Sequence, residues 1–364
     1  MKKESPPIDI HMYDLWKCFD GLWLEECCND LFEAGVHDDK LAMIYEGNRI
    51  NKMAINTPLG LTERIIVERV VTQGGVTGPV CCATQTDCIG KDSLKRKENL
   101  YMYKGCVGIP ALAMIDDIAK ISLCGIESVK DNAYINSKFE LKKMLLNGTK
   151  CHSLHSGKPC RLCPTLRAHD IPIEKVDKEK YVGDIISHNG KHTSNVTSRR
   201  SKGIGIVNEI INILNSLCLG PHYFHVAMTL RQAMLISVLL FNAETWLRLN
   251  KSDITKLEKV DEMLLRKLLK VPTSTPRVSL YLETGAIPIS LLIKEKRIMF
   301  LHHILTRNED ALISKVFWAQ VNQPAKGDWC TIVDEDMGHI GLQALTFQDV
   351  KQISQGALRS LEYS

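Results

Sequence analysis

The chain has 364 residues, of which 45% are hydrophobic and 24% are charged. This mixture is typical of globular proteins, and it excludes the disordered, collagen-like and low-complexity classes. The net charge of +4 at pH 7 is too small for a histone-like tail. At about 150 residues per domain, the length predicts two or three domains.

The first half of the chain mixes predicted strands with predicted helices. Residues 8–13 alternate by two, which predicts a strand that ends at Asp14, and the apolar spacing over 22–32 is helical. Further elements follow from the same patterns: a hairpin of residues 52–55 and 65–71, a helix over 80–89, strands over 111–115 and 118–123, and a helix over 127–146. This order predicts an α+β domain with helices on one face of an antiparallel sheet.

The second half changes character after Val182-Gly183. Apolar stripes with helical spacing run through residues 207–214 and 257–268, so this part is predicted to be mostly helical. We expect a domain boundary near residue 180. Residues 181–300 hold sixteen basic and nine acidic side chains, a net charge of +7, which leaves −3 for the remainder. This basic stretch is predicted to bind anions.

Cysteine usage bears on the compartment. The thirteen cysteines are an odd number and are scattered along the chain, and the start does not resemble a signal peptide. Both features predict a reducing, intracellular compartment, cytoplasmic or nuclear, for a protein that is not secreted. The longest apolar run, residues 233–241, is shorter than a bilayer span, so no membrane segment is expected.

The adjacent carboxylates Asp116 and Asp117 stand out because apolar residues surround them. Two charges in such a segment are costly to bury without partners, so they are expected to face solvent or a cation. A solvated hairpin turn is the simple alternative, since Asp is common in turns. Asp14 at another predicted strand end favours the cation. Carboxylates that converge from strand ends suit Mg²⁺, which prefers oxygen ligands and leaves positions open for substrate phosphates.

Three motifs in order resemble those of reverse transcriptases from retrotransposons without long terminal repeats. The segment 14–20, with the sequence DLWKCFD, resembles the first palm motif of that family. The segment 73–79, QGGVTGP, resembles the second, and Met114-Ile115-Asp116-Asp117 stands at the place of the paired-aspartate motif. The resemblance extends from about residue 8 to beyond residue 330. It implies a polymerase palm over 1–180, a helical thumb over 181–310 and a connecting segment over 311–364.

The resemblance implies roles for particular side chains. Asp14 and Asp116 would hold two Mg²⁺ ions, with Mn²⁺ as an alternative, and Asp117 would be a supporting carboxylate. Phe19 would meet the sugar of the incoming nucleotide and exclude a 2′-hydroxyl, unless it is an ordinary core aromatic. Gln73 and Gly74 would shape the nucleotide pocket, unless they form a simple turn before a helix. Two lysines, Lys143 and Lys150, are candidates for proton donation to pyrophosphate, but a solvated helix face explains Lys142 and Lys143 equally well.

Departures from the family pattern occur at two places. Met114 and Ile115 replace the aromatic and the small residue that usually precede the aspartates, so we expect altered primer contact. Only thirteen residues precede Asp14, where the family has a fingers region. No endonuclease motif is evident at either end. The chain is therefore expected to be a fragment of a larger polyprotein, without its fingers and endonuclease portions.

A cluster of cysteines and histidines raises the question of zinc. Cys160 and Cys163 have the two-residue spacing that zinc sites use, but there is only one such pair. We therefore expect zinc to be unlikely, and a loop of free thiols and solvated histidines is the favoured interpretation. The neighbouring members of the cluster are Cys151, His152, His155 and His169.

The basic half contains candidate contacts to nucleic acid. Residues 181–184 resemble the hairpin that grips the primer end in these polymerases, through Tyr181 and Gly183. Phosphate contacts from exposed basic side chains would be independent of sequence and sensitive to salt. The alternative is that these side chains pair with the acids Glu258, Asp261 and Glu262. The candidate phosphate contacts are Arg199, Arg200, Lys202, Lys256, Lys259, Arg266 and Lys267.

Taken with the resemblance, the sequence predicts an RNA-directed DNA polymerase. It would use an RNA template, a DNA primer and dNTPs, and would transfer nucleotides to the primer 3′-hydroxyl with two metal ions. The alternative is a catalytically silent retrotransposon remnant that only binds nucleic acid. A third possibility is a zinc-dependent nucleic-acid-binding module built on Cys160 and Cys163, which would bind about one zinc ion per chain.

Overall fold

The computed structural model describes residues 7–49, 51–67, 77–95, 100–123, 125–158, 164–247, 249–339 and 345–353. The chain divides into two compact units: residues 1–103 with 108–189, and residues 104–107 with 190–364. The hairpin at 178–187 therefore belongs to the first unit. The functional domain limits at 180 and 310 stay predictions.

The first unit contains most of the strands and five helices among its described residues. Its elements are β1 (Ile8–Tyr13), α1 (Cys18–Gly21), α2 (Leu24–Glu33), α3 (Asp38–Arg49), β2 (Asn51–Met53), β3 (Asn56–Thr57), β4 (Gly60–Leu61), β5 (Ile65–Val67), α4 (Gly78–Lys95), β6 (Tyr101–Tyr103), β7 (Val107–Ile109), β8 (Leu112–Met114), β9 (Asp117–Leu123), α5 (Ile126–Leu141), β10 (His152–Ser156), β11 (Arg167–Ala168), β12 (Ile171–Pro172), β13 (Glu174–Lys175), β14 (Lys178–Tyr181) and β15 (Asp184–Ser187).

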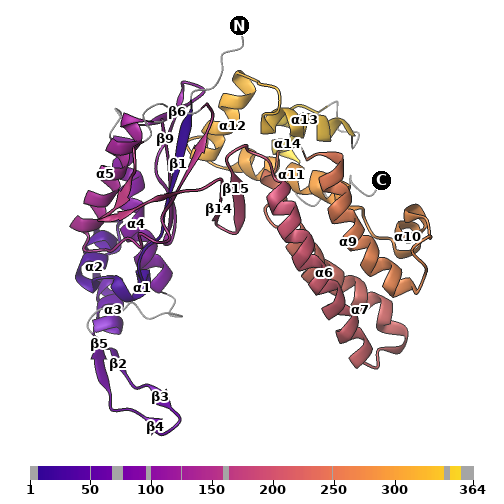
Figure 1. Ribbon diagram of the computed structural model, residues 1–364, viewed down its shortest axis with the longest axis horizontal. Helices are drawn as coiled ribbons and strands as arrows, with labels where there is room; N and C mark the ends of the chain where they lie inside the picture. Colours follow the sequence, from indigo (N-terminus) through magenta and orange to yellow (C-terminus); the bar gives the residue numbers. More distant parts are fainter. Residues whose placement is uncertain are drawn as a thin grey trace. The chain divides into compact units, whose positions relative to one another are not determined.

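A five-stranded sheet organises this unit, with the strand order β13-β10-β1-β9-β8. The central strand β1 is antiparallel to both β9 and β10, and β8 is antiparallel to β9. The helices α4 and α5 contact β8 and β9, and both are drawn on the same side of β1 and β9 in Figure 1. The predicted α+β class is confirmed. The sheet differs from a purely antiparallel one at its edge, where β13 runs parallel to β10.

The core of the first unit lies between this sheet and its helices. Buried side chains from α2, α4 and α5 pack with the end of β1, where Tyr13 is 2% exposed. The same face of β1 also places polar side chains in the interior: His11 is fully buried between the hydroxyls of Ser153 and Ser128, and Ser128 donates to Asp9. These polar groups are tolerated because each has a hydrogen-bond partner.

The second unit is helical, as predicted. Its elements are α6 (Thr193–Ser216), η2 (Gly220–His222), α7 (Tyr223–Leu230), the π-helical turn η3 (Arg231–Ile236), α8 (Ser237–Leu239), η4 (Ala243–Thr245), α9 (Lys251–Leu269), α10 (Arg277–Thr284), α11 (Ile289–Thr306), α12 (Leu312–Asn322), α13 (Trp329–His339) and α14 (Phe347–Gln352).

The apolar stripes of the sequence form the core of this unit. Val207, Ile210 and Leu214 of α6 and Leu257 and Leu264 of α9 are buried in one cluster, and α6 packs along α9. The π-helical turn contributes a buried ion pair, in which the Arg231 guanidinium binds both carboxylate oxygens of Asp261 at 2.7 and 2.8 Å. Among the residues that the structure describes, no helix is both long and apolar enough to cross a bilayer.

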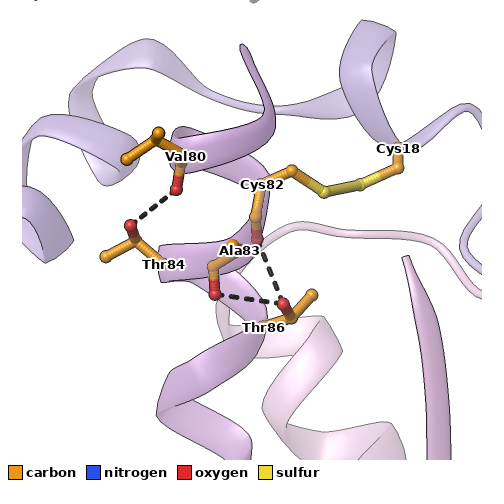
Figure 2. The surroundings of a disulfide bond; sticks show 6 residues. All are labelled: Cys18, Val80, Cys82, Ala83, Thr84 and Thr86. Carbon is orange, nitrogen blue, oxygen red and sulfur yellow. Dashed lines mark hydrogen bonds between the residues drawn. A yellow bond between two sulfur atoms is a disulfide. The ribbon is translucent and has the colours of Figure 1, made fainter. Parts of the chain in front are cut away.

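Two expectations for the first unit are corrected. The helix predicted over 127–146 ends at Leu141, because the chain turns through Lys143 at φ 54° and Leu146 then bridges to Leu15. A second difference concerns cysteine: Cys18 of α1 and Cys82 of α4 are joined by a disulfide (Figure 2). This pair departs from the free thiols that a reducing compartment predicts.

Candidate active site

Asp14 and Asp117 stand at the same end of two paired strands. The last register pair of β1 and β9 joins Tyr13 to Ile118, so Asp14 follows one strand at the point where Asp117 begins the other. Antiparallel neighbours at this position are about 5 Å apart between Cα atoms. The strand pairing therefore brings together two carboxylates that are far apart in the sequence.

The turn between β8 and β9 carries Asp116. Met114 pairs with Asp117, which leaves Ile115 and Asp116 as the two turn residues. Ile115 has φ 59°, a conformation that is costly for a β-branched side chain and that Gly or Asn usually adopts in such turns. Backbone conformations of this kind persist where the surrounding structure enforces them, often at functional sites.

The pKa of Asp117 is affected by both of the other carboxylates. Burial raises the pKa of Asp117, and the negative charges of Asp116 and Asp14 raise it further, while Lys180 acts in the opposite direction. Like charges at short range disfavour the ionised form of each other. The structure thus places the three carboxylates that the sequence singled out within electrostatic range of one another, but in the described part of the chain they do not form a cluster of three metal ligands.

Asp14 is held by Asn147, a residue that the sequence did not indicate. The amide of Asn147 donates to Asp14 Oδ2 at 3.1 Å, and the Asn147 backbone N–H donates to the Asp14 carbonyl at 2.8 Å. Lys150, one of the two candidate lysines, has its Nζ 3.7 Å from Asp14 Oδ2. The other candidate, Lys143, has its Nζ 4.8 Å from the Trp23 ring centroid. Asn147 was missed because it is 133 residues from Asp14 in the sequence.

The β14–β15 hairpin brings Tyr181 and Lys180 to the carboxylates. Its two-residue turn is Val182-Gly183, with φ 46° and 83°. The Tyr181 hydroxyl donates to the Leu112 carbonyl at 3.4 Å. Burial and the Asp117 charge raise the pKa of Tyr181 to about 12, so its hydroxyl keeps its proton at neutral pH. The sequence did not indicate Lys180 either, because the pattern of a short polar hairpin does not show which of its side chains face a site.

The predicted nucleotide contacts are placed only in part. Phe19 lies in α1, partly buried against the core of the first unit, so both the sugar contact and the core role stay open. Gln73 and Gly74 lie outside the described residues. The same is true of Cys160 and Cys163. In the described ranges, no three His, Cys, Asp or Glu side chains converge closely enough to hold a metal ion.

The described histidines of the cysteine and histidine cluster lie beside carboxylates. His152 lies 2.8 Å from Glu179, His155 lies 2.8 Å from Asp9, and His169 lies 3.5 Å from Glu140. Cys151 is buried behind Asp14, and burial raises the pKa of its thiol to about 11. Within the first unit these histidines therefore lie beside carboxylates, and Cys151 belongs to the core.

The candidate phosphate contacts of the second unit fall into two groups. Arg200, Lys202 and Lys259 are exposed. Four others contact protein groups. Arg199 is 7% exposed, and its guanidinium lies 4.7 Å from the Phe241 ring centroid. The remaining three donate hydrogen bonds: Lys256 to Asp253, Arg266 to Glu262, and Lys267 to Asn208.

The acids of α9 are paired with basic side chains, but only the Arg266–Glu262 pair is of the kind that the alternative interpretation expected. The other partners come from different elements. Arg277 contacts both Glu258, at 3.0 Å, and Glu262, at 3.6 Å, and Arg231 contacts Asp261. Burial of Arg199 removes it as an accessible phosphate contact. The exposed side chains on α6 and α9 remain candidates.

Comparisons with known proteins gave matches in solved structures alone. No family model matches the sequence, and no curated protein matches it significantly. The chain is similar to telomerase from Candida tropicalis in complex with the TWJ fragment of telomeric RNA, with a TM-score of 0.44 and 13% identity over 99% of this chain and 50% of that one. It is also similar to the corresponding complex from Candida albicans, with a TM-score of 0.40 and 11% identity over 97% of this chain and 50% of that one.

A third similar structure is the apo telomerase from Candida tropicalis, with a TM-score of 0.41 and 11% identity over 99% of this chain and 54% of that one. The chain thus spans about half the length of these telomerases. The comparisons do not single out the retrotransposon reverse transcriptases that the sequence motifs resemble. The likeness is to telomerases, at low identity.

Proposed function

We propose that the chain is the palm and thumb portion of an RNA-directed DNA polymerase of retrotransposon origin. It would add dNTPs to a DNA primer on an RNA template. The observation that carries the proposal is the strand pairing that places Asp14 and Asp117 at neighbouring ends of β1 and β9, with Asp116 in the adjoining turn. These are the carboxylates of two motifs whose order and spacing resemble the family.

The donor set fits a hard divalent cation. Asp117 carries a pKa raised partly by its two carboxylate neighbours, and a cation would relieve that repulsion. Mg²⁺ is commonly held by one or two carboxylates together with water and substrate phosphates, so Asp14 and Asp116 would suffice as protein ligands, with Asp117 in support. When bound, two such ions would activate the 3′-hydroxyl and neutralise the leaving pyrophosphate.

Other residues would position the reactants around these carboxylates. Asn147 fixes Asp14 Oδ2 through its side-chain amide. Tyr181 stays protonated at neutral pH and Lys180 lies near Asp117, so the hairpin presents a hydroxyl and a cation beside the site. We expect Arg200, Lys202 and Lys259 to contact phosphates of the duplex.

Primer extension tests the proposal. The purified chain is supplied with a poly(rA)/oligo(dT) duplex, dTTP and Mg²⁺, beside the Asp116→Asn variant. We expect extension by the parent and a loss of at least about 100-fold in the variant, because metal contacts contribute several kcal/mol to such reactions. Asp310→Asn is the matched control, since Asp310 is an 87% exposed carboxylate of the second unit and its change should leave extension intact.

Two other outcomes of the extension assay would contradict the proposal. Equal extension by the parent and Asp116→Asn would remove the proposed mechanism. No extension by the parent, together with duplex binding that weakens with salt, would indicate the silent remnant that only binds nucleic acid. In that case the Lys259→Ala variant should reduce the slope of log binding constant against log salt concentration by about one.

A further inference from the structure

A short segment after α5, residues 145–151, lies alongside the part of the chain that carries Asp14, and we call it the strap. The Trp16 backbone N–H donates to the Leu145 carbonyl at 2.8 Å. The Asn147 backbone N–H donates to the Asp14 carbonyl, also at 2.8 Å, and the residues between these two bonds form an antiparallel bridge. The strap therefore fixes the backbone of Asp14, although Asn147 is 133 residues from it in the sequence.

The strap also contacts the Asp14 carboxylate through two side chains. The amide of Asn147, which is 8% exposed, donates to Asp14 Oδ2 at 3.1 Å. Lys150 Nζ lies 3.7 Å from the same oxygen, but its side chain is 67% exposed, and ion pairs of exposed lysines are weak and geometrically loose. The buried amide of Asn147 is therefore the stronger constraint on the orientation of the carboxylate.

Thr149 determines which way the Asn147 amide faces. An ionised carboxylate only accepts hydrogen bonds, whereas an amide has donors on its nitrogen and an acceptor on its oxygen. The Thr149 hydroxyl donates to Asn147 Oδ1 at 2.8 Å, so the amide oxygen is engaged and the nitrogen is turned toward Asp14. Without this hydroxyl, the flipped amide, whose oxygen would repel the carboxylate, would be disfavoured less.

Gly148 allows the strap to lie where it does. A Cβ at this position would lie 2.5 Å from Ile171 Cβ and 2.8 Å from Ile171 Cγ2. Ile171 is in β12, and its Cβ is bonded to the backbone, so this atom cannot move aside as the tip of a long side chain would. Any other residue would therefore displace the strap or β12. Because Gly148 stands between Asn147 and Thr149, such a displacement would disturb both of their hydrogen bonds.

We propose that Thr149 and Gly148 are positioning residues of the candidate active site, and that they act on the Asp14 carboxylate through Asn147. This inference rests on the proposed polymerase function, in which Asp14 is a metal ligand. Thr149 fixes the orientation of the Asn147 amide, and Gly148 fixes the place of the strap. A carboxylate that is already oriented loses less freedom when a cation binds, so these contacts raise the affinity of the site for the cation.

Manganese binding tests the role of Thr149 without any need for catalysis. The purified full chain is titrated with MnCl₂, and free Mn²⁺ is measured from its electron paramagnetic resonance signal. Thr149→Val keeps the shape of the side chain but removes the hydroxyl, and we expect it to weaken Mn²⁺ binding by about tenfold, as for other groups that orient metal ligands. Thr149→Ser keeps the hydrogen bond and should bind within about twofold of the parent.

The matched control for the lost hydroxyl is Thr229→Val. Thr229 is an exposed threonine of the second unit, and its hydroxyl donates to the His225 carbonyl at 3.0 Å. This variant should bind Mn²⁺ like the parent. If Thr149→Val also bound like the parent, or if Thr149→Ser failed to restore the affinity that Thr149→Val loses, the hydroxyl would not orient the site and the inference would be overturned.

A double-mutant cycle tests whether Thr149 acts through Asn147. Asn147→Ala should weaken Mn²⁺ binding at least as much as Thr149→Val, and the double variant should bind like Asn147→Ala alone, because the hydroxyl has no amide left to orient. Losses that add in the double variant would overturn the inference.

Gly148→Ala tests the place of the strap. We expect it to weaken Mn²⁺ binding by about fivefold or more, since the strap carries the group that orients Asp14. Gly47→Ala is the matched control, because Gly47 is a glycine of α3 with nothing within 4 Å of an added Cβ, and it should bind like the parent. Equal binding by Gly148→Ala and the parent would contradict the role of the strap. Urea unfolding in EDTA checks that each variant is folded.

The failure of this inference differs from the failure of the proposed function. A parent that binds Mn²⁺ but extends no primer would remove the polymerase, and the variants would still decide the role of Thr149 and Gly148. A parent that binds no Mn²⁺ would overturn both. If the chain extends primers, the loss of extension in Thr149→Val should shrink as Mg²⁺ is raised, because a weakened site fills again at higher concentration. A loss that stays the same at saturating Mg²⁺ would overturn the inference.

Discussion

At the scale of single residues, Asp117 links stability to metal affinity. Burial and two neighbouring carboxylates raise its pKa, so the folded chain keeps this proton to a higher pH than the unfolded chain does. Burial and crowding therefore cost no stability below the ordinary Asp pKa of 3.8, and they lower stability progressively as the pH rises from there through the raised value. The effect is small because Asp117 is partly exposed and water screens it.

Asp117→Asn should therefore stabilise the chain in the absence of divalent cations. Removing one of three like charges relieves repulsion, and we expect a rise of about 1–2 °C in Tm at pH 7 in EDTA. Mg²⁺ should raise the Tm of the parent more than that of the variant, since a ligand that binds the folded chain more tightly stabilises it more. Thermal unfolding in EDTA and in Mg²⁺ measures both. A variant with a lower Tm in EDTA would contradict the predicted repulsion.

His11 is a second residue whose environment predicts a pH effect. Burial lowers its pKa to about 4, with Asp9 acting in the opposite direction and Lys120 and Lys175 lowering it further. In the unfolded chain the imidazole titrates near 6.5. The folded chain therefore binds fewer protons between these values, and its stability falls as the pH decreases from 6.5 to 4.

The size of this loss follows from the pKa difference. At 1.36 kcal/mol per pKa unit, the shift corresponds to about 3 kcal/mol between pH 6.5 and pH 4. His11→Gln should reduce the pH dependence of the unfolding free energy by this amount over this range, whatever its effect at pH 7. Urea unfolding at several pH values measures the slope. An unchanged slope in the variant would place the titration elsewhere.

At the scale of elements, the crossing of α6 with α8 and α9 depends on Gly203. A Cβ at this position would lie 2.7 Å from Leu239 Cδ2 and 3.0 Å from Val260 Cγ1. Any residue with a Cβ atom at this position would require the neighbouring core side chains to move. Gly205, two residues further along α6, has nothing within 4 Å of such a Cβ.

Gly203→Val should destabilise the second unit by about 1–3 kcal/mol, the usual cost of overpacking a core. Gly205→Ala should instead stabilise it by about 0.5–1 kcal/mol, because Ala favours the helix and meets no neighbour. Chemical denaturation of the full chain compares the two variants. If both changes had the same sign, backbone propensity rather than packing would control this helix.

At the scale of the whole molecule, the fold draws residues 104–107 into the second unit, although the flanking sequence belongs to the first. Lys104 donates to Asp328 Oδ2 at 2.7 Å and to the Gln323 carbonyl at 2.6 Å. Both partners of the ion pair are less than a fifth exposed, at 14% and 17%. A lysine in this setting is expected to contribute because little water competes for its partners.

Lys104→Met should lower the stability of the second unit by about 1–3 kcal/mol, since the Asp328 carboxylate would lose its cationic partner. The matched control is Lys315→Met, whose partner Asp310 is 87% exposed, and which should change stability by less than about 0.5 kcal/mol. Urea unfolding of the full chain provides the comparison. Equal effects of the two substitutions would mean that burial of the Lys104 pair has no energetic consequence.

Periodicity accounts for what could be predicted of the fold. The strand that ends at Asp14, the strands around Asp116 and Asp117, and the stripes on α6 and α9 were predicted correctly. Each of these elements depends on residues close to it in the sequence, so the local pattern of apolar residues is enough to predict it. The helix predicted to reach residue 146 ends at Leu141 because a distant bridge, Leu15 to Leu146, competes with the helical pattern.

By itself, the sequence determined the α+β and helical division, the three carboxylates and the uneven charge. The tertiary structure alone decided that Asn147 and Lys180 lie beside those carboxylates, that Arg199 is buried, and that Cys18 meets Cys82. The physical reason is the range of the interactions. Strand and helix patterns arise between near neighbours, whereas these contacts follow from how whole elements pack, which no local spacing encodes.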